Sequence, residues 1–276
     1  MTNVLILGGT GKTGRRIARR LQAAGQPVRR ASRTTGDVLF DLDDPATWAP
    51  ALDGVAGVYV MEPNLQASMD HEARIPAFVD RAVGAGARRL VLLSAPAADD
   101  DDHPLHAAEQ AVRGSGVVWT ILRPSWFSQN FSEAFWRLGI LDGTLALPTG
   151  DGRAPFVDAG DIAEVAASAL TEDGHGGRVY ELTGPRALSF GEAVDLIGKA
   201  TGRTVRHVDV DAETFVRRQV AYGVSPKVAR LLTGLLVDIR DGSGAALTDG
   251  VERALGRPPT SFEDFVARTA AAGDWN

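Results

Sequence analysis

The sequence contains no cysteine, and this absence excludes several kinds of site. Without thiols the chain forms no disulfide, no iron–sulfur cluster and no cysteine-ligated metal centre. A long apolar run is also missing, so we predict no membrane span and no secretory leader. These absences agree with a cytoplasmic protein, which is the location we expect.

The chain also lacks an excess of basic residues. It carries 29 Lys and Arg against 35 Asp and Glu, a formal net charge of −6. Such a balance argues against a nucleic-acid or anionic-membrane partner. Hydrophobic residues make up 44% of the 276 positions, which is ordinary for a globular protein. The length suits one large domain, or a domain with an additional lobe.

Glycine, in contrast, is concentrated near the start of the chain. The apolar run Val4–Leu7 leads into the turn Gly8-Gly-Thr-Gly-Lys-Thr-Gly14, and apolar residues then recur at helical spacing until Gly25. A strand, a glycine turn and a helix in this order predict a site for the pyrophosphate of a dinucleotide. A P-loop would need glycine where this chain has Ile6, so that alternative is excluded.

The next predicted strand, Val28–Ser32, bears on the choice of nucleotide. An NAD(H) site usually has an acidic residue at the end of this strand, whereas this chain has Ser32-Arg33, with Arg29 and Arg30 just before. Arginine can bind a 2′-phosphate with two hydrogen bonds. We therefore favour NADP(H), with NAD(H) still possible. The alternative is that these arginines form a solvated basic face.

Predicted strands and helices alternate over residues 1–124. Further strands are expected at 37–40, 55–61, 90–93 and 117–122, and helices at 44–52, 68–83 and 104–113. This alternation predicts an α/β fold, a Rossmann-type doubly wound parallel sheet. Ligands bind such sheets at the carboxyl ends of the strands, where Arg33, Asp41, Met61 and Ser94 fall.

From residue 125 to 276 the alternation loosens. We expect a smaller, mainly helical substrate lobe that covers the crevice and is interleaved with late Rossmann elements at about 156–183. Segments 145–148 and 154–157 flank Gly150-Asp-Gly152 and suggest a hairpin. Ser189 and Glu192 form a capping box at the start of a helix. The chain from Ala212 onward is expected to be mainly helical.

Several segments together are similar to one family. They are Gly8–Gly14, Ala31-Ser-Arg33, Ile121-Leu-Arg-Pro-Ser-Trp-Phe-Ser-Gln-Asn-Phe131, Phe156-Val-Asp-Ala-Gly-Asp-Ile-Ala163 and Tyr180-Glu-Leu-Thr-Gly184. Over nearly its full length the chain resembles the NmrA-like, atypical short-chain dehydrogenase/reductases. Within that family it is most similar to the ergot-alkaloid-type iminium dehydrogenases, and it is also similar to the quinone reductases.

The resemblance implies a set of site residues. Those expected to line the cofactor are Gly8, Thr10, Gly11, Lys12, Thr13, Gly14, Ser32 and Arg33, with Asp41 and Leu42 at the adenine and Met61, Ser94 and Ala95 toward the nicotinamide. Trp126, Phe127 and Asn130 would border the substrate, although clustered aromatics also commonly pack a core. Asp158 and Asp161 match the family pattern too, but helix capping would explain both.

The catalytic pair of most short-chain dehydrogenases, Tyr-x-x-x-Lys, is absent. None of the three lysines has a tyrosine four residues before it. An iminium substrate would need no proton donor, whereas a carbonyl or quinone would. His106, Glu109 and Ser94 are the catalytic candidates for that proton transfer; the alternative is that His106 and Glu109 are a surface pair at helical spacing. The acidic stretch Asp99–His103 is expected to be a solvated loop rather than a metal site.

We therefore expect an NADP(H)-dependent reductase that transfers hydride to a small planar or cyclic substrate with a C=N, C=C or quinone group. The alternative is a dinucleotide sensor of the NmrA type that acts through a protein partner. We expect a monomer or homodimer with a small-molecule substrate, and neither a nucleic-acid nor a membrane partner.

Overall fold

The computed structural model describes residues 3–63, 72–134 and 136–276. The chain divides into two compact units. Unit 1 comprises Met1–Pro124, Ala159–Leu182 and Gly250–Arg257, and unit 2 comprises Ser125–Asp158, Thr183–Asp249 and Pro258–Asn276.

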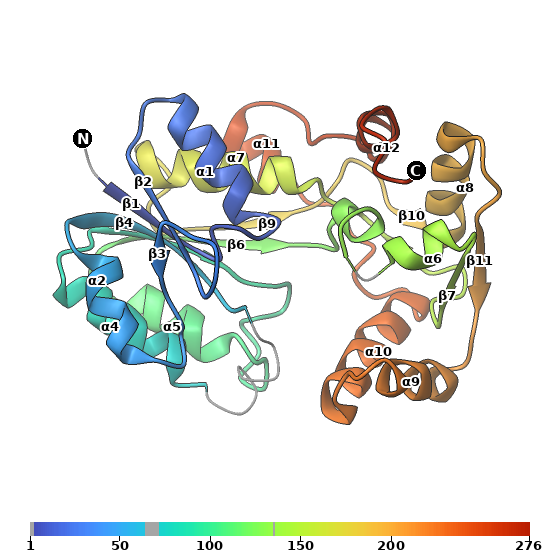
Figure 1. The fold of residues 1–276 in the computed structure, drawn as a ribbon, viewed down its shortest axis with the longest axis horizontal. Coiled ribbons are helices and arrows are strands. Elements are labelled where there is room, and N and C mark those ends of the chain that lie inside the picture. Colours follow the sequence, from blue (N-terminus) through green and yellow to red (C-terminus); the bar gives the residue numbers. More distant parts are fainter. Residues whose placement is uncertain (1–2, 64–71, 135) are drawn as a thin grey trace. The chain divides into compact units, whose positions relative to one another are not determined.

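Unit 1 is built on a seven-stranded sheet in which every neighbouring pair is parallel (Figure 1). The strand order is β3-β2-β1-β4-β5-β6-β9. Their bounds are β1 Asn3–Leu7, β2 Val28–Ser32, β3 Val38–Leu39, β4 Val55–Met61, β5 Arg89–Leu93, β6 Val118–Pro124 and β9 Arg178–Leu182. This sheet confirms the predicted doubly wound fold.

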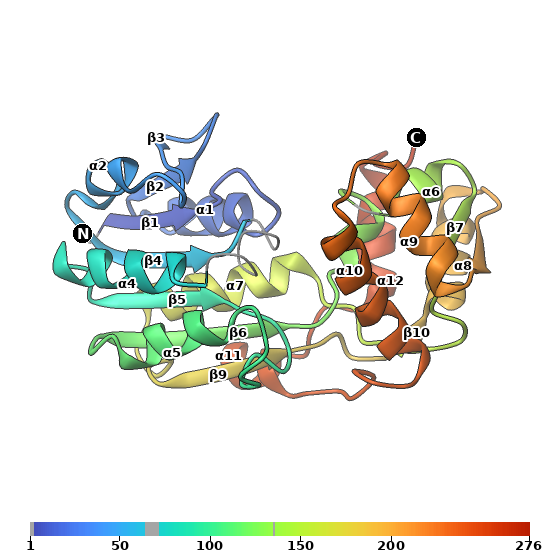
Figure 2. The same cartoon turned by 90° about the horizontal axis from the view of Figure 1, so that it is seen from below.

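Helices cover both faces of this sheet, so its central strands are apolar on both sides. Helices α1, α7 and α11 lie on one face and α2, α4 and α5 on the other (Figures 1 and 2). Their bounds are α1 Gly14–Ala23, α2 Trp48–Leu52, α4 Arg74–Gly84, α5 His106–Gly114, α7 Ala159–Thr171 and α11 Gly250–Leu255, with the 3₁₀ helix η1 at Pro45–Thr47. Leu5, Val58 and Leu90, on three adjacent strands, are fully buried. The carboxyl ends of these strands are therefore held in place by a tightly packed core.

Unit 2 contains the remaining described helices and two short sheets. Its helices are η2 Ser128–Phe131, α6 Arg137–Leu141, α8 Phe190–Thr201, α9 Ala212–Ala221, α10 Pro226–Arg240 and α12 Phe262–Ala271. Its strands are β7 Thr144–Leu147, β8 Arg153–Ala154, β10 Leu188–Ser189 and β11 Arg206–Asp209. The helical character expected from Ala212 onward is confirmed.

The predicted hairpin around Gly150–Gly152 is wrong. The two flanking strands do not pair with each other: β7 pairs in parallel with β11, and β8 pairs antiparallel with β10. Each finds its partner far along the chain, which local turn chemistry cannot reveal. Gly152 packs where a Cβ would lie 2.1 Å from the Ile239 carbonyl oxygen, so α10 lies directly against this turn.

Aromatic side chains form the core of unit 2. Phe131 contacts the rings of Trp136, Phe156 and Phe262 in edge-to-face geometry, with centroids 4.8 to 5.3 Å apart. The indole N–H of Trp275 donates to the Phe131 carbonyl at 2.9 Å. Phe131 and Trp136, which follow the predicted substrate residues Trp126 and Phe127 in the sequence, are thus core residues.

Several local predictions can be compared with the structure directly. The capping box of Ser189 and Glu192 is confirmed. The helix expected at 44–52 begins as the 3₁₀ helix η1, whose N-cap Asp44 accepts from the Ala46 N–H. The predicted strand at 37–40 is shorter, Val38–Leu39. The helix expected from Ser68 begins at Arg74, and residues 68–71 lie outside the described residues. No helix in the described ranges has the length and apolar character needed to cross a membrane.

Candidate functional site

The glycine turn joins β1 to α1 through contacts that exclude side chains. Gly8 has φ +60°, and its carbonyl accepts the Gly11 N–H at 2.8 Å. A Cβ on Gly14 would lie 2.2 Å from that same carbonyl oxygen, and a Cβ on Gly9 would lie 2.6 Å from the Cβ of Arg30. Only glycine fits at these positions, and the backbone is left open to a close ligand.

The start of α1 has the character of an anion site. The N-cap residue Thr13 makes no side-chain cap, and the first turn contains no acidic residue. The Thr13 hydroxyl instead accepts a hydrogen bond from the buried Tyr59 hydroxyl at 3.0 Å. Burial raises the pKa of Tyr59, so this phenol remains a donor. The helix start therefore offers partial positive charge without a built-in carboxylate. The remaining turn residues differ in exposure, since Thr10 is exposed and Lys12 is half-buried.

The three arginines near the end of β2 have different surroundings. Arg29 donates to the carbonyls of Ala51 and Asp53, both at 2.7 Å, where α2 ends. Arg30 forms a two-point ion pair with Asp37, at 3.1 and 2.7 Å. Arg33 is exposed and has no hydrogen bond or ion pair to any described residue. Of the three, Arg33 is the guanidinium left available to a ligand.

The other predicted cofactor residues follow the carboxyl ends of neighbouring strands. Ser32 accepts the backbone N–H groups of Thr34 and Thr35, each at 3.1 Å. The Asp41 carboxylate accepts the Asp43 N–H at 3.0 Å, while the Leu42 side chain packs in the core.

Two further predicted cofactor residues, Met61 and Ala95, lie at the carboxyl ends of the central strands β4 and β5. The Met61 sulfur lies across Gly8, 2.9 Å from where a Cβ would stand. Ala95, half-buried, follows Ser94 beyond β5.

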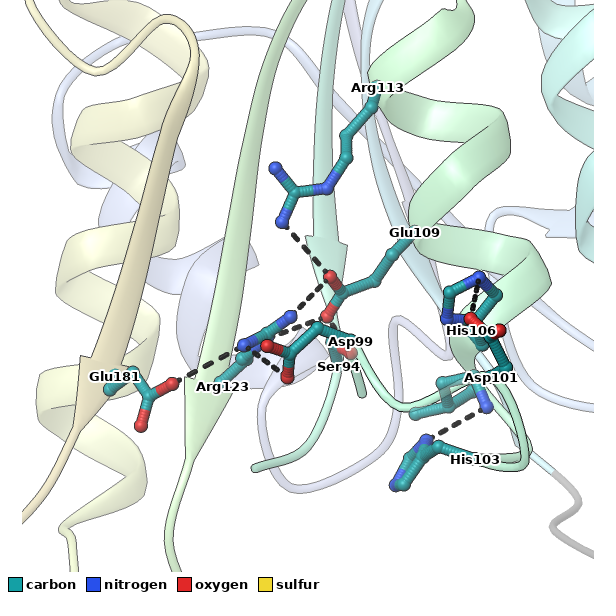
Figure 3. Close-up of polar contacts among 10 residues, drawn as sticks. Ser94, Asp99, Asp101, His103, His106, Glu109, Arg113, Arg123 and Glu181 are labelled. Atoms are coloured by element: carbon teal, nitrogen blue, oxygen red, sulfur yellow. Dashed lines mark hydrogen bonds and ion pairs between the residues drawn. The ribbon is translucent and has the colours of Figure 1, made fainter. Parts of the chain in front are cut away.

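A buried polar network lies at the ends of β5 and β6 (Figure 3). The Ser94 hydroxyl donates to Glu109 Oε1 at 2.6 Å, and Glu109 receives Arg123 Nε at 2.9 Å and Arg123 Nη2 at 2.8 Å. Arg113 adds a longer contact to Glu109 at 3.3 Å. The remaining nitrogen of the Arg123 guanidinium, Nη1, donates to Asp99 at 3.1 Å and to Glu181 at 3.4 Å.

Glu109 in this network is a carboxylate rather than a proton donor. Its side chain is 1% exposed, and burial alone would raise its pKa. Hydrogen bonds from Arg123 and Ser94 outweigh that effect and lower the pKa of Glu109. The bond to Glu109 in turn raises the pKa of Arg123. The suggestion of a surface pair formed by His106 and Glu109 is therefore wrong, because Glu109 is buried and bound to an arginine from another element.

His106 points toward the acidic loop instead. Its Nε2 lies 3.5 Å from Asp101 Oδ1, and its buried Nδ1 has no partner in the described ranges. His103 accepts the Leu105 N–H on Nδ1 at 3.0 Å, and burial lowers its pKa. The acidic stretch is thus partly engaged in ion pairs, with Asp99 bound to Arg123. Within the described residues no group of three His, Cys, Asp or Glu side chains could hold a metal ion.

The predicted substrate residues belong to unit 2. The Trp126 ring lies 5.5 Å from the Trp136 ring, and Phe127 bridges to Val157. The Asn130 N–H donates to the Phe127 carbonyl at 3.0 Å, and the Asn130 side chain is buried.

Asp158 and Asp161 both bind arginines. Asp158 pairs with Arg268 at 2.5 Å within unit 2, and Asp161 pairs with Arg257 at 2.8 Å within unit 1. The two carboxylates are buried, so they tie distant parts of the sequence together in each unit.

Comparison with known proteins places this chain among dinucleotide-dependent enzymes. A protein-family model described as NAD(P)H-binding matches residues 8–173. An uncharacterised oxidoreductase, YesF of Bacillus subtilis, is 37% identical over 97% of this chain and 95% of its own length. An NAD(P)H azoreductase of Xenophilus azovorans is 32% identical over 98% of both chains. A festuclavine dehydrogenase of Aspergillus fumigatus is 31% identical over 97% of this chain and 98% of its own length.

Solved structures share the fold at lower identity. A triphenylmethane reductase from Citrobacter, complexed with NADP(H), is 21% identical, with a TM-score of 0.77 over 97% of this chain and 99% of that one. An NADPH-dependent quinone oxidoreductase from Escherichia coli, complexed with NADPH, is 22% identical, with a TM-score of 0.75 over 96% and 99%. With the glycine turn, the parallel sheet and these relatives, the chain belongs to the NAD(P)H-binding, NmrA-like family of atypical short-chain dehydrogenase/reductases and is an NAD(P)H-dependent oxidoreductase.

Proposed function

We propose that this protein is an NADP(H)-dependent reductase that transfers hydride to a small planar or cyclic acceptor with a C=N, C=C or quinone group. The observation that carries this proposal is the network of Ser94, Glu109 and Arg123. It occupies the strand end and the helix at which a proton-donating pair would be expected. Near neutral pH none of its members is a proton donor to a substrate, because Glu109 is ionised, Arg123 keeps its proton, and the hydroxyl hydrogen of Ser94 is directed at Glu109.

The cofactor would be held by the glycine turn and the strand ends around it. The side-chain-free contacts of Gly9 and Gly14 and the uncapped start of α1 fit a pyrophosphate. Met61, Ser94 and Ala95 would lie toward the nicotinamide, and Asp41 and Leu42 toward the adenine. When bound, the reduced nicotinamide supplies a hydride.

Preference for NADP(H) rests on Arg33. Arg29 and Arg30 are engaged by carbonyls and by Asp37, so they do not compete for a phosphate. Arg33 alone of the three is exposed and without a partner in the described part of the chain, and it directly follows β2. A guanidinium there suits the 2′-phosphate, as it does for other phosphates. Both solved structures named above are described with NADP(H) or NADPH.

The direction of the Ser94 hydrogen bond supports the proposed substrate class. Its hydrogen is directed at an ionised carboxylate, so Ser94 does not protonate an oxygen. Hydride addition to an iminium carbon moves the π electrons onto nitrogen and gives a neutral amine without a proton. A quinone or activated C=C would give a delocalised anion that takes its proton from water. The azoreductase and the quinone oxidoreductase are named for substrates that contain azo or quinone groups. Trp126, Phe127 and Asn130 are proposed to border the substrate.

Binding and isotope measurements test this proposal together. NADPH and NADH are titrated by fluorescence, and a panel of cyclic imines and quinones is then screened for NADPH oxidation. We expect tighter binding of NADPH, turnover of at least one panel member, a primary isotope effect with NADPH deuterated at C4, and a solvent isotope effect close to one. A large solvent isotope effect on the hydride step would contradict proton-free transfer. Tight binding without turnover on the panel would favour a sensor, and no binding of either nucleotide would reject the cofactor site.

A further inference from the structure

The hydroxyl of Ser94 can point its hydrogen in only one direction. Glu109 Oε1 lies 2.6 Å from Ser94 Oγ, and as a carboxylate it can only accept. Ser94 must therefore be the donor in this contact. Charge-assisted hydrogen bonds of this length are among the stronger ones in proteins, so the direction is firmly set.

With its hydrogen directed at Glu109, Ser94 Oγ can take part in a further hydrogen bond only as an acceptor. Apart from Glu109, the structure gives this oxygen no hydrogen-bond partner among the described residues, although Ser94 is only 6% exposed. Its backbone is fixed as well, because the Ser94 N–H donates to the Leu122 carbonyl at 2.7 Å. Ser94 thus presents a lone pair at the carboxyl end of β5, the edge at which ligands of such sheets bind.

We propose that Ser94 accepts a hydrogen bond from the carboxamide N–H of the bound nicotinamide, and that Glu109 and Arg123 are positioning residues that set the direction of this bond. The carboxamide is the one N–H donor on the nicotinamide ring, so it matches an oxygen that can only accept. This inference rests on the cofactor placement of the proposed function.

Glu109 and Arg123 come from two different elements and close the network around Ser94 (Figure 3). Arg123, on β6, holds both carboxylate oxygens of Glu109, on α5, at 2.9 and 2.8 Å. This grip keeps Glu109 charged, and only a charged Glu109 forces Ser94 to donate. Asp99 and Glu181 accept from a different nitrogen of Arg123, Nη1, whereas the hydroxyl of Ser94 is hydrogen-bonded to Glu109. A substitution at Asp99 therefore perturbs Arg123 without changing the partner of Ser94, so the positioning role of Glu109 can be tested separately from the stability that Arg123 gives to the fold.

The test compares two reduced dinucleotides, NADPH and its 3-acetylpyridine analogue, in which an acetyl group replaces the carboxamide and removes its N–H. Dissociation constants are measured by calorimetry for the wild type and for Ser94→Ala. We expect the substitution to raise the dissociation constant of NADPH about fivefold, in line with the loss of one hydrogen bond. The dissociation constant of the analogue should change by less than about twofold. Asp99→Asn is the control: it removes the charge from a contact to Arg123 but should leave the ratio of the two dissociation constants unchanged.

Glu109→Gln tests the positioning role, because a neutral amide no longer forces Ser94 to donate. The preference for NADPH over the analogue should then fall toward that of Ser94→Ala, whereas a merely structural role would weaken both ligands alike. If Glu109→Gln does not fold, Ser94→Ala alone decides. Equal weakening of both ligands by Ser94→Ala, or no change in either, would overturn the inference while the proposed function stands. Failure of the wild type to bind NADPH would overturn both.

Discussion

Substitution of Arg33 by alanine should convert a preference for NADPH into near-indifference between NADPH and NADH. Arg33 is exposed and has no partner in the described residues, so its removal breaks nothing within the protein. The change is therefore expected in the binding of the 2′-phosphate alone, and the affinity for NADH should stay within about twofold of the wild type.

The magnitude follows from the exposure of Arg33. Two unit charges 4 Å apart in water attract by about 1 kcal/mol. A phosphate monoester carries a charge of roughly −1.5 to −2 at neutral pH, so the contact should contribute about 2 kcal/mol. That corresponds to a roughly 30-fold weaker affinity for NADPH. Because the site is open to solvent, the difference should shrink as salt is added.

Fluorescence titrations with both nucleotides, at low and high salt, measure this ratio. Arg29→Ala is a matched control, since it removes the same charge from a nearby position, on β2 itself. Arg29 binds the carbonyls at the end of α2, so its loss should lower the melting temperature and leave the NADPH-to-NADH ratio unchanged. Equal loss of both nucleotides in Arg33→Ala, or an equal shift of the ratio in Arg29→Ala, would refute the assignment of the 2′-phosphate to Arg33.

Two further predictions concern the glycine turn and the buried network. Gly14→Ala would place a Cβ 2.2 Å from the Gly8 carbonyl oxygen, so we expect a lower melting temperature and at least about tenfold weaker NADPH binding. Gly84→Ala, which meets no atom within 4 Å, should change neither. Glu109→Gln should lower the free energy of unfolding at pH 7 by about 3 kcal/mol, since it breaks a buried pair and leaves Arg123 with its weaker contacts. Because the pKa of Glu109 is lowered in the folded protein, its ionised form contributes stability that is complete above the ordinary pKa of 4.5. This contribution is progressively lost as the pH falls through the pKa of Glu109 in the folded protein. The unfolding free energies of the wild type and Glu109→Gln, measured by urea titration, should therefore converge in acid.

The sequence predicted the elements whose signals are local. β2 has the predicted bounds Val28–Ser32, and Ser189 with Glu192 caps α8 as expected. A run of apolar residues, a glycine turn or a cap lies within a few positions, and propensity and hydrogen bonding act over that range. The order of elements then determined the doubly wound sheet, since right-handed crossovers leave few alternatives.

Distant pairings were beyond such reasoning. Nothing near β7 shows that β11, about sixty residues later, is its partner, and a hairpin was the local alternative. Glu109 was placed at helical spacing from His106, yet its partner Arg123 lies on a strand. The spacing of a pair on one helix is visible in a sequence, whereas a buried ion pair between helix and strand depends on how they pack.

The two units are not consecutive stretches of sequence: the chain passes between them at residues 124/125, 158/159, 182/183, 249/250 and 257/258. On its last visit to unit 1 it forms α11, where a Cβ on Gly250 would stand 2.0 Å from the Glu181 carbonyl oxygen of the edge strand β9. Neither unit can therefore be expressed as a single fragment, and a stop codon before Gly250 would strip the flank of that edge strand. Exchange of unit 2 between relatives would require five matched junctions. New specificities in this architecture are thus expected to arise by point substitution within an intact chain rather than by shuffling of domains.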